Sequence, residues 1–173
     1  PVASGECEIH AWDLESQLAR KVPGREPKVY RAPRLSKFVP SKTVARPAAY
    51  LVPQEETAVL EKLRHHGIEV ERIAEASVFE GEVYRIEAIG TLPSPDVGDL
   101  IRKETVVAAR METAAVRARA GDVLVPIDRP LGTLAIYLLE PESDDGLVRW
   151  GYFDRNLAVG KPYPVARIRR LTP

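Results

Sequence analysis

Two histidines of this chain stand at a spacing that could bind a metal ion. Glu69 follows His66 by three residues, and Asp13 follows His10 in the same way. A catalytic zinc usually takes three protein ligands and leaves one position open, so an autonomous metalloenzyme would need His10, His66 and Glu69 to meet in the folded chain. No histidine follows His66, and Gly67 is expected to end a helix within the His66–Glu69 pair. We therefore interpret both patterns as chance matches, and predict no catalytic residue, no metal ligand and no cofactor in this chain.

A second candidate site is an acidic loop, residues 140–146, followed by an aromatic cluster. Its adjacent aspartates could bind calcium, but the loop lacks the regular oxygen-ligand spacing and the later bidentate glutamate of an EF-hand. The favoured interpretation is a turn whose carboxylates cap local amides, with the aromatic side chains packed in a small core. The functional alternative is a domain-docking surface or a ligand contact formed by Asp144, Asp145, Trp150, Tyr152 and Asp154.

Positive charge is concentrated in one segment, although the net charge of the whole chain is zero. Residues 20–46 contain nine Lys or Arg side chains and a single acidic one, Glu26. Four prolines in the segment remove amide donors and favour extended geometry, which argues against a long helix. We expect residues 1–46 to form an extended basic arm, with one strand near residues 28–31. The arm is either a solvated linker, which we favour because few aromatic residues stand between the cations, or an element that binds an anionic partner.

The composition is that of a globular protein, with 45% apolar and 29% charged residues among 173. No apolar run approaches the ~20 residues of a membrane-spanning helix, and the first residues do not have the pattern of a signal peptide. The single cysteine, Cys7, excludes an intrachain disulfide. We therefore expect no membrane span, and the net charge of zero gives no argument for a nucleic-acid partner, which we do not expect.

The segment from residue 49 to residue 73 predicts a strand, a helix and a second strand. Its middle part places Val59, Leu60 and Leu63 on one apolar stripe of a helix. Gly67 suits the left-handed position that follows the last residue of a helix. The expected elements are a strand at 49–52, a helix at 54–66 and a strand at 68–73.

The rest of the chain predicts mainly strands. Tyr84, Ile86 and Ala88 alternate with charged residues, as in a strand with one exposed face. Residues 103–119 are ambiguous: we favour two strands, because residues 120–122 are typical of a hairpin turn, and keep a helix as the alternative. The other expected elements are a loop at 91–99, a strand at 123–125, a short helix at 131–139 and a last strand at 163–168.

These elements predict an α+β fold with a mostly antiparallel or mixed β-sheet and about two helices packed on one face. We expect two parts: the arm at 1–46 and an α+β accessory domain at 47–173.

Three stretches resemble one family. Residues 129–154 read RPLGTLAIYLLEPESDDGLVRWGYFD, residues 46–53 read RPAAYLVP, and residues 163–168 read YPVARI. Their amino-acid sequences resemble the region that follows the catalytic domain in bacterial zinc carboxypeptidases of the carboxypeptidase A-like class. Arg129 stands where that family would have glutamine.

The resemblance implies that this chain is a non-catalytic C-terminal accessory domain of a secreted or periplasmic metallopeptidase. Zinc, the peptide substrate and the hydrolytic chemistry would then belong to a catalytic domain absent from this chain, on which the accessory domain packs. The alternative from another class is a stand-alone binding module that uses the basic segment 20–46 to hold an anionic partner.

Overall fold

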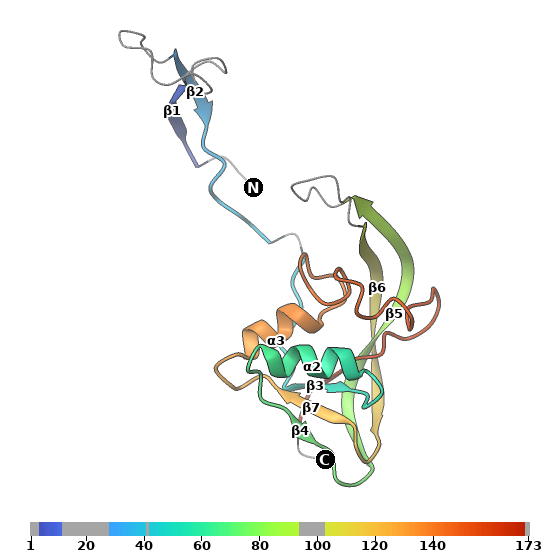
Figure 1. Ribbon diagram of the computed structural model, residues 1–173. Coiled ribbons are helices and arrows are strands. Elements are labelled where there is room, and N and C mark those ends of the chain that lie inside the picture. The colour runs from blue at the N-terminus through green and yellow to red at the C-terminus, as the bar shows by residue number, and fades with distance from the viewer. Residues whose placement is uncertain (1–3, 12–27, 41, 94–102, 172–173) are drawn as a thin grey trace. The chain divides into compact units, whose positions relative to one another are not determined.

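The computed structural model describes residues 4–11, 28–40, 42–93 and 103–171. The chain divides into two compact units, residues 1–45 and residues 46–173. The described part of the first unit contains an antiparallel pair of strands, β1 (Glu6–Ala11) and β2 (Lys28–Pro33), drawn in blue in Figure 1. The strand expected near 28–31 is therefore confirmed, whereas β1 was not anticipated. The part of the basic segment before residue 28 lies outside the described residues.

The second unit is built on a six-stranded sheet with the strand order β4–β7–β3–β8–β5–β6, in which every neighbouring pair is antiparallel. Two short helices, α2 and α3, accompany it (Figure 1). This confirms a mostly antiparallel sheet with two helices. The strands are β3 (Ala49–Val52), β4 (Glu71–Arg72), β5 (Ser77–Pro93), β6 (Lys103–Ala118), β7 (Val123–Pro126) and β8 (Ala166–Ile168).

Helix α2 (Thr57–His65) is shorter than expected. It begins at Thr57 because the chain makes a turn directly after β3, in which the Glu56 amide donates to the Pro53 carbonyl at 3.0 Å. It ends as the sequence predicted: Gly67 has φ +73°, and the Ile68 amide donates back to the Leu63 carbonyl at 3.0 Å. The strand expected at 68–73 is only two residues long, as β4.

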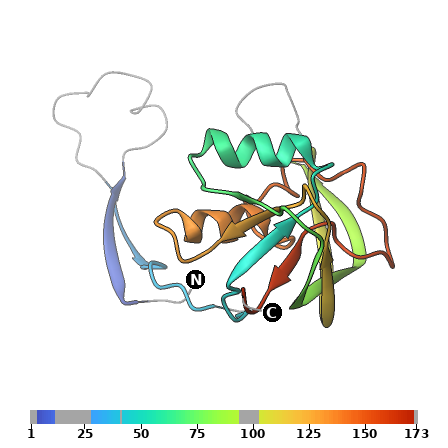
Figure 2. The same cartoon turned by 90° about the horizontal axis from the view of Figure 1, so that it is seen from below.

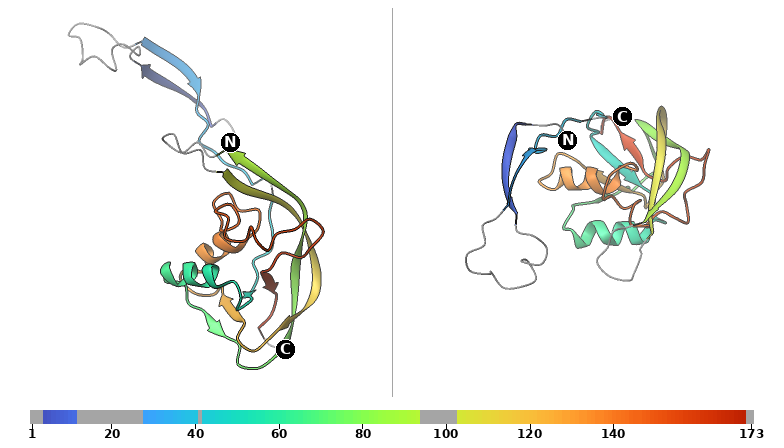
Figure 3. Two further views of the ribbon diagram at one scale, coloured as in Figure 1. Left: turned by 45° about the vertical axis from the view of Figure 1, so that its right-hand side comes forward. Right: turned by 90° about the horizontal axis from the view of Figure 1, so that it is seen from above.

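Strands β5 and β6 form one long hairpin, and here the sequence prediction was wrong. Residues 103–119 form neither two strands nor a helix, because β6 pairs with β5 along its whole length. The ladder is irregular only at Glu87, where β5 carries one extra residue. Figures 2 and 3 show the hairpin curving along the side of the unit. The loop expected at 91–99 is still strand up to Pro93, and residues 94–102 lie outside the described residues.

The turn after β6 is also not a hairpin turn. Gly121 adopts φ +96°, as a tight turn requires. The strand that follows, β7, pairs with β3 and β4, whereas β6 pairs with β5. The turn at Gly121 therefore carries the chain from one edge region of the sheet to the other.

Buried apolar residues form two clusters. Neighbouring residues of β3 and β7 alternate between them, which places the clusters on opposite sides of these strands. The larger cluster includes Tyr50 and Val52 of β3 and the buried apolar side chains of both helices, and the smaller one includes Ala49 and Leu51. Both helices contribute to the larger cluster, which supports the expectation that they cover one face of the sheet. That both pack on one face stays a prediction.

The second helix, α3 (Gly132–Leu139), agrees with the predicted segment 131–139. It ends at Glu140, whose backbone is extended before Pro141. Residues 140–165 then form a series of turns, and the last strand is shorter than the predicted 163–168. No helix in the described ranges has the length and apolar character that a bilayer crossing requires.

Candidate functional site

The structure brings together only some of the site residues predicted in the acidic loop and the aromatic cluster. The Trp150 indole Nε1 donates a hydrogen bond to Asp145 Oδ1, which brings these two predicted site residues together. Asp144 lies instead 3.8 Å from a guanidinium nitrogen of Arg149. Asp154 accepts a hydrogen bond from the Thr105 hydroxyl at 2.8 Å, and so holds the loop against β6 rather than joining the other carboxylates.

A pocket of about 330 Å³ opens beside the Trp150 indole. Three of the five predicted site residues line it, namely Asp145, Trp150 and Tyr152; Asp144 and Asp154 are not among its lining residues. Most of the remaining walls come from α2 and α3, which lie side by side in Figures 1 and 3. The end of α2 supplies Lys62 and its cap His66, α3 supplies Leu134, Tyr137 and Leu138, and the segment after α3 supplies Leu147.

The sequence analysis missed the helical part of this pocket. Lys62 and His66 are four residues apart on α2, and Leu134 and Leu138 have the same spacing on α3, so each pair shares one side of its helix. This spacing was a visible signal for a common face. What the spacing could not show is that the two helices face the same loop, because that depends on contacts between distant segments.

The two residues of the His-x-x-Glu pattern have separate local contacts. His66 caps the C-terminal end of α2, and Glu69 lies 3.6 Å from the Arg129 guanidinium in an exposed ion pair. Within residues 4–11, 28–40, 42–93 and 103–171, no three His, Cys, Asp or Glu side chains come together as a metal site would require. His10 lies in β1 opposite Val29, and Asp13 is outside the described residues.

Two described cations of the basic segment, Arg31 and Lys28, have local contacts. Arg31 pairs with Glu8 across the β1–β2 ladder, with an N–O distance of 3.1 Å. The Lys28 ammonium lies 5.2 Å from the centre of the Tyr30 ring. Both contacts belong to the strand pair itself, so they account for these two cations without an external anion.

Among the described residues of the second unit, the most buried charged side chain is that of Arg167 in β8, which is 1% exposed. Its guanidinium lies 3.3 Å from Glu140 and 3.4 Å from Glu82. The hydroxyls of Tyr50 and Tyr84 also donate to Glu140, that of Tyr84 at 2.6 Å. Glu140 thus joins the end of α3 to strands β3, β5 and β8, and this cluster had no signature in the sequence.

Burial sets the protonation of the tyrosines in this cluster. Desolvation, reinforced by the nearby Glu140 carboxylate, raises the pKa of Tyr50 and of Tyr84 well above its ordinary value. Desolvation likewise raises the pKa of the fully buried Tyr163, whose hydroxyl donates to the Leu139 carbonyl at 3.1 Å. The three phenols are therefore neutral hydrogen-bond donors over the ordinary pH range.

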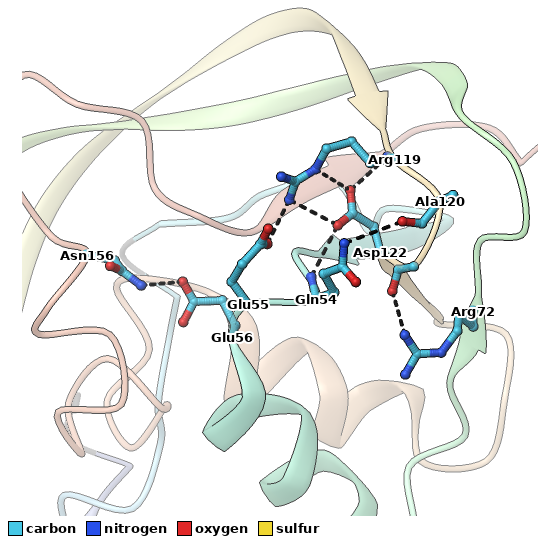
Figure 4. A network of polar contacts seen from close by, with 9 residues as sticks. Gln54, Glu55, Glu56, Arg72, Arg119, Ala120, Asp122 and Asn156 are labelled. Atoms are coloured by element: carbon cyan, nitrogen blue, oxygen red, sulfur yellow. Dashed lines mark hydrogen bonds and ion pairs between the residues drawn. The ribbon is translucent and has the colours of Figure 1, made fainter.

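A second polar network fixes the start of α2, as Figure 4 shows. Asp122 is buried and accepts hydrogen bonds from the amides of Gln54 and Arg119, at 3.1 Å and 2.8 Å. Burial acts to raise the pKa of Asp122, but these amides and the Arg119 guanidinium outweigh it, so that the pKa lies below its usual value. Arg119 also reaches Glu55 at 2.7 Å, which links the β6–β7 turn to the helix.

The acidic loop has a structural task on β6 as well. Glu142 Oε1 accepts a hydrogen bond from the Ala109 amide at 3.0 Å, opposite the irregularity at Glu87. Arg149 forms an ion pair with Glu104 at 2.7 Å. Together with Asp154 and Thr105, these contacts attach the loop to the outer strand of the sheet and hold the wall of the pocket in place.

Comparisons with known proteins find sequence similarity between this chain and carboxypeptidases. No family model matches the chain, and no solved structure matches it. The chain is 27% identical over 130 residues to carboxypeptidase 2 of Trichophyton tonsurans, a match that covers 73% of this chain and 22% of that protein. It is 27% identical over 131 residues to carboxypeptidase 2 of Trichophyton equinum and 25% identical over 130 residues to that of Trichophyton rubrum.

The chain thus spans between a fifth and a quarter of the length of these relatives. The similarity supports a carboxypeptidase-related region, in agreement with the general class that the sequence motifs indicated. These relatives are fungal, whereas the motifs suggested a bacterial group.

Proposed function

We propose that this chain is a non-catalytic accessory region of a zinc carboxypeptidase-like protein. It packs on a catalytic domain that lies outside the chain, and supports that domain. The observation that carries the proposal is the extent of the sequence match: it covers 73% of this chain but only 22% of Trichophyton tonsurans carboxypeptidase 2. Most of a protein of that length would have to come from other segments.

The contacts of the acidic residues support a structural, non-catalytic role for this chain. Glu140 joins α3 to three strands, Glu142 binds a strand amide, and Asp154 binds Thr105. These carboxylates serve the fold of this unit. The zinc, and the glutamate that a zinc peptidase needs as a base, would accordingly reside in the other domain.

Three finer points belong to the same proposal. The parent protein is bacterial, it is exported to the periplasm or secreted, and it acts on peptides through its catalytic domain. All three rest on the resemblance of residues 129–154 to the bacterial group, and the fungal relatives leave them open to test.

The first test is the native protein itself. Its mass, with the reading frame that surrounds this region, should show a chain well above 19.2 kDa that also carries a peptidase domain with His-x-x-Glu and a further distant histidine. A native chain of about 19 kDa, flanked by no peptidase sequence, would overturn the proposal.

The supporting role can be tested in that longer protein. Deleting residues 46–173 should lower the melting temperature of the catalytic domain and reduce peptide hydrolysis. The control is the intact protein with one zinc ligand of the catalytic domain replaced, which should lose hydrolysis but keep the contact between the two parts. If the deleted protein melts and hydrolyses peptides like the intact one, the accessory role is wrong.

A further inference from the structure

The two edges of the six-stranded sheet differ in length. At one edge β4 (Glu71–Arg72) has only two residues, whereas at the other edge β6 (Lys103–Ala118) has sixteen. An edge strand presents a row of backbone amides and carbonyls that can pair with a strand of another chain. The edge formed by β6 is therefore the one at which such pairing can occur.

The hydrogen bonds of β5 show which residues of β6 point toward this edge. In an antiparallel ladder, two residues directly opposite each other either exchange hydrogen bonds or both point away from each other. The Ile86 amide and the Tyr84 carbonyl bond to the segment before β8, at 3.0 Å and 2.7 Å, and so point away from β6. Their register partners on β6, Ala109 and Met111, accordingly face the edge.

The acidic loop covers the first part of the edge. The Thr105 amide donates to the Arg149 carbonyl at 3.3 Å, and the Ala109 amide donates to Glu142 Oε1 at 3.0 Å. Both donors stand at odd-numbered positions of β6, in agreement with the directions that β5 indicates. The loop thus takes the place of a neighbouring strand as far as residue 109.

Beyond residue 109 lies an open edge, which consists of Met111, Thr113, Ala115 and Arg117. These residues face outward because β6 carries no extra residue, so that the alternation continues along the strand. All four are exposed, and their amides have no acceptor within the described part of the chain. Residues 110–118 include no proline and no bulge, which are common protections of an edge against pairing.

We propose that this open edge pairs antiparallel with the open edge of a second copy of the chain, about a two-fold axis at Ala114. Met111 of each copy then lies opposite Arg117 of the other, and Thr113 lies opposite Ala115. Each of these four pairs exchanges two hydrogen bonds, so that about eight form in total. The inference is independent of the proposed function, because it concerns only the sheet of this chain.

Charge and side-chain size favour a second copy as the occupant. In this register no two like charges stand opposite each other. Arg117 comes to lie beside the Glu142 carboxylate of the other copy, which is the next group along that edge, at Ala109. Opposite charges therefore meet at both ends of the paired segment. Residues 113–115 at its centre are threonine and alanines, which allow the strands to approach to the usual spacing of about 4.8 Å.

The assembly should contain two copies and no more. A two-fold contact uses the open edge of both copies, and so closes on itself. The opposite edge, at β4, is too short to continue the sheet into a third copy.

Sedimentation equilibrium of the full chain is the first test. We expect the apparent mass to rise from 19.2 kDa toward twice that value as the protein concentration increases. A Kd on the order of 100 µM is expected, because a contact of one strand edge is small for a protein–protein interface. Amide hydrogen exchange locates the contact: the four open-edge amides should gain protection with protein concentration. The even-numbered amides between them, which bond to β5, should be protected already in the monomer.

A proline substitution tests the backbone contact. Ala115→Pro removes one donor of the open edge, and it leaves the ladder with β5 intact because this amide points away from β5. It should weaken self-association at least about tenfold. Ala115→Val keeps the amide and is the matched control, with a Kd within about threefold of the unmodified chain. Circular dichroism shows whether both variants are folded.

A charge reversal tests the register without touching the backbone. Arg117→Glu would bring its carboxylate beside that of Glu142 in the other copy, and should weaken self-association at least about tenfold. Arg64→Glu makes the same change of charge at an exposed position of α2, and should leave the Kd unchanged.

Three outcomes would overturn the inference. The first is a mass that stays at that of the monomer up to about ten times the expected Kd. The second is a dimer whose open-edge amides gain no protection, since its contact would lie elsewhere. The third is equal self-association of the Arg117 and Arg64 variants, which would exclude the two-fold pairing at Ala114.

Discussion

The guanidinium Nε of Arg167 lies 3.3 Å from Oε1 of Glu140, and this ion pair connects the last strand to the end of the last helix. Both side chains are taken out of water, and Tyr50 and Tyr84 complete the surroundings of the carboxylate. A buried pair of this kind contributes little against an apolar replacement of both partners. Loss of one partner is costly, because the remaining charge stays buried.

Replacement of Arg167 by methionine should therefore destabilise the second unit strongly. We expect a loss of about 3–5 kcal/mol in the free energy of unfolding, since Glu140 and Glu82 would keep their charges without the guanidinium. Urea denaturation followed by circular dichroism measures it. Arg169→Met is the control, because Arg169 is half-exposed: it pairs with the exposed Glu80 at 3.4 Å and approaches Glu82 only at 3.8 Å. It should cost less than about 1 kcal/mol, and equal losses in the two variants would contradict the role of the buried pair.

Because these tyrosines are neutral in the folded chain, we expect the free energy of unfolding to fall at alkaline pH. Above the ordinary tyrosine pKa near 10, phenols of the unfolded chain release protons that Tyr50, Tyr84 and Tyr163 keep in the folded chain. The folded state then binds more protons than the unfolded state, so the free energy of unfolding falls as the pH rises. The slope should reach about 1.4 kcal/mol per pH unit for each such tyrosine.

Urea unfolding at half-unit steps from pH 8 to pH 11 measures this slope. The Tyr84→Phe variant should show a shallower decline above about pH 10, because one of the three titrating phenols is gone. A stability that stays constant over this range in the unmodified chain would show that these hydroxyls are not protected by burial.

Asp122 should be important for the attachment of α2 to the β6–β7 turn. In Asp122→Asn, the side-chain amide cannot accept from the Gln54 and Arg119 donors on both of its atoms. We expect a loss of about 1–3 kcal/mol in the free energy of unfolding. The difference should be complete at neutral pH and start to shrink as the pH falls below about 4, disappearing only below the lowered pKa of the folded state, because the carboxylate stabilises the fold only while it is charged.

Thermal and urea denaturation at pH 7 and pH 3 give this comparison. Glu55→Gln is the control, since Glu55 belongs to the same network but lies at the surface. Its removal should change the stability little at either pH. A Glu55 effect as large as that of Asp122 would mean that the exposed ion pair, and not the buried acceptor, holds the network together.

Gly81 should tolerate no side chain. A Cβ atom there would lie 2.2 Å from the Arg167 carbonyl oxygen and 2.8 Å from a methyl group of Val116, so β5 and β8 would have to separate. Gly81→Ala should cost about 1–3 kcal/mol in the free energy of unfolding. Gly90→Ala on the same strand meets its nearest atom at 3.4 Å. It should be neutral or stabilise by up to about 1 kcal/mol through the unfolded state, and urea denaturation of the two variants distinguishes them.

The sequence by itself determined the elements whose signals are local. Val59, Leu60 and Leu63 repeat at helical spacing, and all three are buried on α2. Gly67 ends that helix in the left-handed conformation. The apolar run at 49–52 is β3, and the segment 131–139 contains α3. Such signals act between residues within one or two turns of each other, so they can be read without knowing the rest of the fold.

The tertiary structure decided everything that depends on distant partners. Residues 103–118 have mixed local preferences, and pairing with β5 makes them one long strand. Arg167, Glu140 and Tyr84 lie far apart in the chain, and they meet because β5 and β8 are neighbours in the sheet. The predicted site residues lie in separate places for the same reason. Asp145, Trp150 and Tyr152 line a pocket together with residues of two helices, whereas Asp154 binds to β6. Contacts of this kind are fixed by strand order and packing, which no short stretch of sequence specifies.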